Sequence, residues 1–281
     1  MPIVKAADGV ELHYDLHDYT DPWKRGPVLI LQHGFGRSSR FWYNMVPYIA
    51  RHYPVVCPNL RGLGPSPADF DIDKAITVDN YIGDLVAIIE SLGRGPVHYA
   101  GESLGGILGF ALAAEHPELV RTLSVFAAPL VISAWTQKTF AFEHPTWQDA
   151  LGSMGAEGWA RAVNTATRFP PDTDPDLLEW FAREMGKSRV EVMIAMSRLA
   201  SKVDATPSLS RIKAPVLGLY PSGGAIVSGD QEETLRARIA DLTVVHLPTR
   251  YHMVHTLFPA TCAEYVLSFM ALHDGRVVRE T

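Results

Sequence analysis

The sequence predicts a doubly wound α/β fold, in which a mainly parallel sheet is covered by helices on both faces and interrupted by a helical insert. Three observations predict it. Short apolar runs typical of strands buried on both faces recur along the chain. Helical periods lie between these runs, and strands that alternate with helices favour parallel pairing. Residues 130–208 contain no Val/Ile-rich strand run and are instead rich in aromatic residues and methionine.

The N-terminal residues predict a β-hairpin followed by the first buried strands. Residues 3–5 and 10–14 flank Asp8-Gly9, a dipeptide that favours a tight turn between antiparallel strands. The buried strands are expected at the apolar runs of residues 28–31, 54–57, 96–100 and 122–126.

Helices are expected where apolar residues recur at intervals of three and four positions. The clearest case covers residues 78–92, where Thr77 is suited to cap the N-terminus and Gly93 to end the helix. The alternation resumes near residue 215. From there the pattern predicts, in order, a strand, a helix, a strand and a helix at residues 215–220, 232–239, 243–247 and 260–272.

The change of composition after Pro129 divides the chain. Residues 190–200 have a helical pattern, and the strand–helix alternation is absent around them. We therefore assign residues 1–129 and 209–281 to one α/β core, and residues 130–208 to a helical cap inserted in it.

Composition excludes several classes of protein. The 281 residues are 47% hydrophobic and 20% charged, which is typical of a globular chain and not of a disordered one. The net charge of −6, without a basic stripe, argues against nucleic-acid binding. No apolar run reaches the roughly 20 residues that cross a bilayer, and residues 1–9 lack a signal core, so we expect a cytoplasmic protein.

The two cysteines predict neither a disulfide framework nor a metal site. Cys57 and Cys262 both stand in apolar runs, as small core residues do. The sequence implies no metal and no cofactor. It leaves a homodimer open.

The segment Gly101-Glu102-Ser103-Leu104-Gly105 matches G-x-S-x-G directly after a predicted strand and before a helical run. Glycine on each side allows a sharp turn from strand to helix, which lifts the serine hydroxyl above the sheet edge. The helix that follows points its N-terminus at developing negative charge. In this context the motif indicates a nucleophilic serine.

Two further segments are predicted to lie at the same edge of the sheet as Ser103. Residues 33–36, His-Gly-Phe-Gly, follow the first buried strand. Loops at the carboxyl ends of parallel strands line the ligand crevice of such a sheet, so backbone N–H groups of this loop can face the serine. His252 lies between the last strand and the last helix, on the crevice side, and His255 beside it is interpreted as a packing residue.

Taken together, these segments resemble the α/β-hydrolase family, in the group with a helical cap inserted after the sixth strand, over nearly the whole chain. The resemblance includes the His33 to Gly36 loop and the run from Val55 to Ser66. It also includes the serine turn and the segment around His252. Asn59 stands where aspartate is common, at a position that is normally structural.

The resemblance implies a role for four residues. Ser103 would be the nucleophile, His252 its general base and later its general acid, and the backbone N–H groups of Phe35 and Leu104 the oxyanion hole. The roles also follow from chemistry, because a serine hydroxyl needs an adjacent base at neutral pH and a tetrahedral oxyanion needs fixed donors. A serine nucleophile argues against dehalogenase and epoxide-hydrolase chemistry, which use aspartate.

The cap implied by the resemblance walls an apolar pocket over the serine, and Trp42 and Gly34 are candidates for the pocket wall. A small helical cap must also bury its own core, which accounts for most of its aromatic residues. We expect a hydrophobic small molecule as substrate, and neither a nucleic acid nor a membrane as partner.

The resemblance also implies a carboxylate that completes a triad with Ser103 and His252, and this acid is missing from both places where the family carries it. Gly224 occupies the slot after the strand at 215–220, and residues 126–129 carry no carboxylate. The remaining candidates are Glu143 in the cap, Asp230 and Glu102.

Each remaining carboxylate has a competing explanation. Asp230 is better explained as a helix N-cap with glutamate three residues later. Glu102 neighbours the serine and is expected to point away from the histidine. Asp84, on the helix at 78–92, is interpreted as a solvated or packing residue. The sequence leaves the acid unresolved.

The leading hypothesis is a cofactor-independent serine hydrolase that cleaves a carboxylic ester or lactone through an acyl-enzyme on Ser103. The same fold and serine also serve C–C bond hydrolysis, and acyl transfer to an acceptor other than water. A non-catalytic receptor or degenerate hydrolase is the alternative from another class, because fold does not fix function. The missing acid favours this alternative, whereas the intact serine turn and His252 argue against it.

Overall fold

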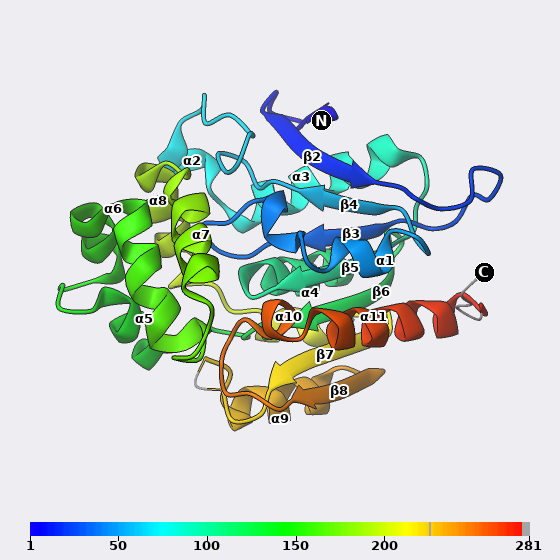
Figure 1. Cartoon of the computed structure of the whole chain (residues 1–281). Helices are drawn as coiled ribbons and strands as arrows, with labels where there is room; N and C mark the ends of the chain where they lie inside the picture. The colour runs from blue at the N-terminus through cyan, green and yellow to red at the C-terminus, as the bar shows by residue number, and fades with distance from the viewer. Residues whose placement is uncertain (225, 277–281) are drawn as a thin grey trace.

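The structure, a computed structural model, describes residues 1–224 and 226–276. Eight strands form one sheet in the order β1-β2-β4-β3-β5-β6-β7-β8 (Figure 1). The pairs β1–β2 and β2–β4 are antiparallel, and every other neighbouring pair is parallel. The strands are β1 Ile3–Lys5, β2 Glu11–His17, β3 Leu29–Gln32, β4 Val55–Pro58, β5 Val97–Glu102, β6 Val120–Phe126, β7 Val216–Pro221 and β8 Leu242–Leu247.

Helices pack on both faces of the sheet, which confirms the predicted doubly wound arrangement. The α-helices of the core are α1 Val46–Ile49, α2 Ile72–Ala75, α3 Val78–Leu92, α4 Leu104–Glu115, α9 Gly229–Arg238, α10 Val254–Leu257 and α11 Pro259–His273. Short 3-10 turns lie at Ser39–Trp42 and Thr206–Arg211. Helices α3 and α4 lie together on one face, and α1 and α11 lie together on the other.

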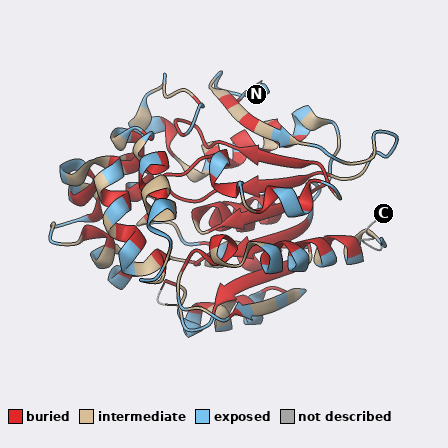
Figure 2. Cartoon of the chain, in the orientation of Figure 1, coloured by how far each residue is buried: buried red, intermediate tan, exposed pale blue. Residues whose placement is uncertain are grey.

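The continuous apolar strand runs supply both hydrophobic cores, because successive side chains point to opposite faces of a sheet. Leu29 and Leu31 belong to the core under α1 and α11, whereas Ile30 between them belongs to the core under α3 and α4. The central strands are therefore buried along their length (Figure 2). Cys57 and Cys262 are free and buried in the first of these cores, as their apolar surroundings predict.

A helical insert follows the sixth strand, as the sequence predicts. Figure 1 shows it in green, packed beyond one end of the sheet. It comprises α5 Ala134–Ala141, α6 Trp147–Val163, the π-helical turn Asn164–Arg168, α7 Pro175–Gly186 and α8 Val190–Ala200. The two ends of the insert are joined by an isolated β-bridge between Val131 and Asp204. The chain therefore leaves and re-enters the core at adjacent positions.

Local signals at the helix ends are confirmed in one case and wrong in another. The Thr77 hydroxyl accepts a hydrogen bond from the Asn80 N–H at 3.1 Å, and Gly93 ends α3 in the left-handed conformation with φ 59°. Ser228 occupies the N-cap position of helix α9, without a capping hydrogen bond from its side chain, so Asp230 lies inside the first turn and is not the N-cap. The backbone is helical from Gly229 onward, so the helix begins one residue before Asp230.

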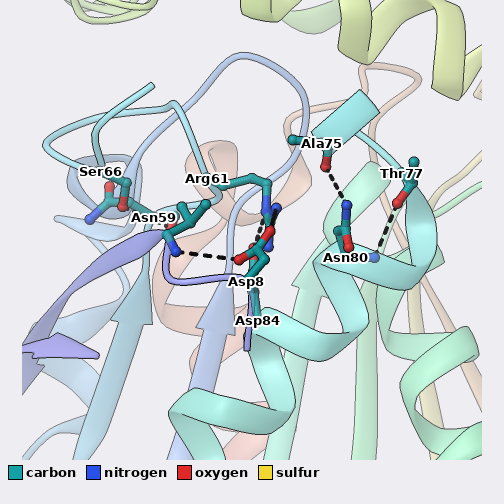
Figure 3. A network of polar contacts seen from close by, with 9 residues as sticks. Asp8, Asn59, Arg61, Ser66, Ala75, Thr77, Asn80 and Asp84 are labelled. Atoms are coloured by element: carbon teal, nitrogen blue, oxygen red, sulfur yellow. Dashed lines mark hydrogen bonds and ion pairs between the residues drawn. The ribbon is translucent and has the colours of Figure 1, made fainter. Parts of the chain in front are cut away.

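Asp84 is not solvated but forms a buried ion pair with Arg61. The Arg61 Nε donates to Asp84 Oδ2 at 2.8 Å, and its Nη1 donates to Asp8 Oδ2 at 2.7 Å (Figure 3). The pair joins the loop after β4 to helix α3. Asn59 has the structural role that its position predicts, since its Oδ1 accepts from the Ser39 N–H at 2.8 Å.

No helix within the described ranges combines the length and apolar character that a membrane span requires.

Candidate active site

The turn between β5 and α4 holds Ser103 in a backbone conformation that non-glycine residues rarely adopt. Its φ is 53° and its ψ −117°. A Cβ on Gly101 would collide with the Gly105 carbonyl, and one on Gly105 would collide with the Gln32 carbonyl of β3. Glycine at both positions therefore allows the tight turn, and the strain at Ser103 is held by the packing around it.

The loop after β3 lies directly against this turn. A Cβ on Gly34 would collide with the Glu102 carboxylate and would stand 3.1 Å from the Ser103 Cβ. Within the residues that the structure describes, the N–H groups of Phe35 and Leu104 donate no hydrogen bond. Leu104 is the first residue of α4, so its N–H has no acceptor inside the helix.

Glu102 points toward His252, not away from it. Its Oε1 lies 3.2 Å from the His252 Nε2, and the two residues are 1% and 5% exposed. The expectation that a residue beside the serine would turn away is wrong here. The reason is local, because the missing side chain of Gly34 leaves room for the carboxylate and Arg37 neutralises it on the other side.

Arg37 forms a buried ion pair with the second oxygen of Glu102. Its Nη1 donates to Oε2, and Arg37 is 2% exposed. Burial by itself would raise the pKa of Glu102, but the Arg37 guanidinium and the adjacent His252 hold that pKa below its ordinary value. Glu102 is therefore ionised at neutral pH.

Burial lowers the pKa of His252 below its ordinary value, and Glu102 opposes this shift. The imidazole is therefore neutral at pH 7 and able to accept a proton. Its Nδ1 is buried and has no hydrogen-bond partner in the described part of the chain. The usual acid slot explains this, because Gly224 offers no side chain there.

The other carboxylates proposed from the sequence lie away from the histidine. Glu143 and Asp230 are both exposed, and neither is paired with His252. Among the described residues, Glu102 is the one carboxylate with an oxygen within 4.0 Å of a nitrogen of this ring. Arg37 was missed in the sequence because nothing in its local pattern separates it from an exposed arginine.

Two curated proteins align with most of the chain, and residues 27–151 match the family model of the alpha/beta hydrolase fold. Strigolactone esterase D14 from Arabidopsis thaliana is 26% identical over 241 residues, which cover 85% of this chain and 90% of that protein. The putative carbamate hydrolase RutD from Escherichia coli O103:H2 is 25% identical over 266 residues, which cover 89% and 93%.

Solved structures show the same fold over nearly the whole chain. The enol-lactonase from Burkholderia xenovorans LB400 superposes with a TM-score of 0.83 at 21% identity, covering 96% of this chain and all (100%) of that one. The chain has the α/β-hydrolase fold. An esterase from Thermogutta terrifontis also superposes on this chain, with a TM-score of 0.82 at 18% identity and a coverage of 97% and 98%.

A small cavity of about 20 Å³ lies at Ser103. Both the core and the helical insert line it, and its polar lining comes from Ser103, Arg37, Arg168 and His252. The apolar part of the wall is formed by Phe35, Leu104, Ile132, Phe140, Trp147, Ala200 and Ile226. A second pocket of about 290 Å³ shares His252 and Ile226 with this cavity.

Two residues expected in the pocket wall have other surroundings. Trp42 packs between Phe126 and His255, with ring centroids at 5.7 and 4.7 Å, and it borders a separate groove of about 990 Å³ that includes neither Ser103 nor His252. Gly34 lies behind the serine, where its missing side chain makes room for Glu102.

The helical insert also holds the loop that carries His252. The His252 N–H donates to the Thr167 carbonyl at 3.1 Å, and the Met253 N–H donates to the Arg168 carbonyl at 3.3 Å. These bonds join a π-helical turn of the insert to the loop after β8. The position of the histidine therefore depends on the insert, although the two segments are far apart in the sequence.

The remaining histidines near the site have structural surroundings. The His33 Nε2 accepts from the Leu60 N–H at 3.2 Å, and burial lowers the pKa of His33 to about 4. Burial likewise lowers the pKa of His255 to about 3, and its ring packs on Trp42. Over the described ranges, no three histidine, cysteine or acidic residues are grouped so that they could hold a metal ion.

Proposed function

We propose that the protein is a serine hydrolase that cleaves a carboxylic ester or lactone of a small molecule through an acyl-enzyme on Ser103. The observation that supports this most is that Ser103, in its strained turn, shares a cavity with a neutral histidine that is itself in contact with an ionised carboxylate. The curated relatives, an esterase and a carbamate hydrolase by name, support hydrolysis as the reaction class.

In the first half of the reaction, the Ser103 oxygen attacks the carbonyl carbon of the substrate and its proton passes to His252. The carbonyl oxygen becomes an oxyanion, which the free N–H groups of Phe35 and Leu104 stabilise. The C–O bond of the ester then breaks, and the imidazolium returns its proton to the leaving oxygen.

In the second half, a water molecule gives a proton to His252 and attacks the acyl carbon. Collapse of the second tetrahedral intermediate releases the carboxylic acid and restores Ser103. Glu102 stabilises the imidazolium through its charge in both halves, since its Oε1 lies 3.2 Å from the ring nitrogen. It replaces the aspartate that is missing at Gly224.

Residues 130–208 act as a cap in this proposal. They supply Arg168 and much of the apolar wall, and through Thr167 they fix the loop that carries His252. The adjoining 290 Å³ pocket provides room for the part of the substrate that extends beyond the reacting carbonyl.

Labelling with a fluorophosphonate probe and turnover of a panel of esters and lactones test the proposal. We expect the probe to add its mass to Ser103, and Ser103→Ala to lower kcat by roughly 10⁶-fold, as for loss of the nucleophile in a triad enzyme. Ser153→Ala is the matched control, because Ser153 is an exposed serine of the cap. Near-normal turnover by Ser103→Ala would exclude the serine mechanism, and no labelling of the wild type would favour a non-catalytic receptor.

A further inference from the structure

Arg168 is a buried arginine that has no carboxylate partner among the described residues. It is 3% exposed and lines the cavity at Ser103. Its Nη1 contacts two neutral atoms, the Asn164 Oδ1 at 3.4 Å and the Met185 Sδ at 3.2 Å. Its Nε and Nη2 donate no hydrogen bond to any described residue. A buried charge normally has a partner of opposite sign, because removing a charge from water is costly.

The buried charges around Ser103 do not cancel. Burial lowers the pKa of both Arg37 and Arg168, but a guanidinium is not deprotonated in proteins, so both are cationic. Glu102 is the carboxylate that faces them. His252 stays neutral because burial lowers its pKa. Glu102 is already occupied by Arg37 through an ion pair. The site therefore carries an excess of one positive charge, and the unmatched charge is that of Arg168.

Hydrogen-bond donors near Arg168 also lack acceptors. The Trp147 Nε1, in the wall of the same cavity, is buried and has no partner among the described residues. Over the same part of the chain, the Asn164 Nδ2 beside Arg168 is also buried without a partner. Stacking of the guanidinium at 5.3 Å from the centre of the Trp159 ring fixes its plane but offers no acceptor to its N–H groups.

The backbone fixes Arg168 relative to the reacting groups. It is the last residue of the π-helical turn Asn164–Arg168, a type of turn that is frequent at functional sites. Its carbonyl accepts from the Met253 N–H at 3.3 Å, next to His252. A ligand group held by Arg168 would therefore stand at a set distance from the histidine.

We propose that Arg168 binds a carboxylate of the substrate, so that the protein acts on a small ester or lactone that carries a free carboxylate as well as the reacting carbonyl. A single carboxylate balances the excess charge, and its two oxygens match the paired donors of a guanidinium. This inference rests on the proposed serine hydrolysis and narrows its substrate from a hydrophobic molecule to an anionic one.

Two matched pairs of esters test the inference with the full-length protein. Monomethyl and dimethyl glutarate place the carboxylate on the acyl side, and 4-acetoxybenzoate and its methyl ester place it on the alcohol side. We expect kcat/KM to be at least tenfold higher for the anionic member of one pair. Equal values in both pairs, or a preference for the neutral member, would overturn the inference.

Variants of Arg168 assign the preference to this side chain. We expect Arg168→Met to lower kcat/KM for the anionic ester by about 100-fold and for its neutral partner by less than threefold. Arg168→Lys should retain part of the preference, because it keeps the charge but not the paired donors. Arg183→Met, which removes an exposed arginine of the cap, is the matched control and should change neither value.

The melting temperature separates substrate binding from a structural role. Arg168→Met removes a buried charge without a partner, so we expect the melting temperature to stay equal or to rise. A lower melting temperature, with both esters affected equally, would show that Arg168 supports the fold and would overturn the inference.

Direct binding distinguishes failure of the inference from failure of the proposed function. If Ser103 is labelled and neutral esters are hydrolysed without a charge preference, the hydrolase proposal stands and the inference fails. If no ester is turned over, glutarate titrated into wild type and Arg168→Met by calorimetry decides the inference alone. Binding that is at least tenfold weaker in the variant supports it, and equal binding overturns it.

Discussion

The Glu102 carboxylate lies against the His252 ring, with Oε1 3.2 Å from Nε2, although Glu102 directly precedes the candidate nucleophile in the sequence. The strained turn at Ser103 allows this arrangement, because the Glu102 and Ser103 side chains leave the turn in different directions. Arg37 then holds the second carboxylate oxygen. The charge that an aspartate after β7 would supply in this fold thus comes from the other side of the ring.

Glu102→Gln should damage both activity and stability. We expect kcat to fall by roughly 10²- to 10⁴-fold, because the imidazolium loses its neighbouring negative charge. The free energy of unfolding should fall by about 3–5 kcal/mol, because Arg37 is left buried without a partner. Ester turnover and urea denaturation measure the two effects.

The double variant Arg37→Met/Glu102→Gln separates these effects, since it leaves no unpaired charge from this pair. We expect it to regain most of the lost stability and none of the lost kcat. Recovery of kcat together with stability would mean that Glu102 serves the fold and not the histidine.

Gly224→Asp alone should not restore a conventional triad. A Cβ at this position would stand 2.5 Å from the Pro221 Cγ, so the side chain cannot enter without moving the end of β7. We expect a lower melting temperature and no gain in kcat. In the double variant Pro221→Ala/Gly224→Asp the obstructing ring is gone. We expect kcat to rise, because an acceptor for the Nδ1 hydrogen of His252 fixes the tautomer whose Nε2 takes the proton of Ser103. An increase with the single variant, or none with the double variant, would contradict this.

Stability should fall as the pH is lowered below about 6.5, because several histidines are buried in the neutral form. The folded pKa is about 3 for His255 and about 4 for His33, whereas the unfolded value is about 6.5. Between these values only the unfolded chain binds the proton, so each histidine removes on the order of 1.4 kcal/mol per pH unit. Above pH 6.5 the effect is absent.

Urea denaturation at pH 7, 6 and 5 checks this dependence. His255→Phe keeps an aromatic ring against Trp42 and cannot take up a proton. We expect the unfolding free energy of this variant to fall less steeply with decreasing pH, by about 1.4 kcal/mol per pH unit, which corresponds to one proton. An unchanged slope would show that His255 does not titrate between the folded and unfolded states.

Two glycine substitutions separate tertiary constraint from helix propensity. Gly105→Ala places a Cβ against the Gln32 carbonyl, so we expect a loss of about 1–3 kcal/mol or more in the free energy of unfolding. Gly83→Ala, on the exposed side of α3 with nothing within 4 Å, should be stabilising by about 0.5–1 kcal/mol. Thermal denaturation compares them, and equal effects would refute the steric explanation of the serine turn.

The eight strands, the longer helices between them, the position of the insert and the turn at Ser103 could all be predicted from the sequence. These features depend on local physics. Side-chain periodicity decides which face of a strand or helix is buried, as in α3 between Thr77 and Gly93. Glycine is required around the serine because a Cβ there would collide with atoms a few residues away or on the adjacent strand.

The charged part of the site was decided by the tertiary structure alone. Arg37 and Arg168 have no local pattern that separates them from exposed arginines, yet both are buried beside Ser103. Glu102 turns toward His252 because a loop from β3 leaves space and supplies a counter-charge. A sequence shows which side chains can ionise, but only contacts between distant segments decide which of those charges lose their water and which partner they face.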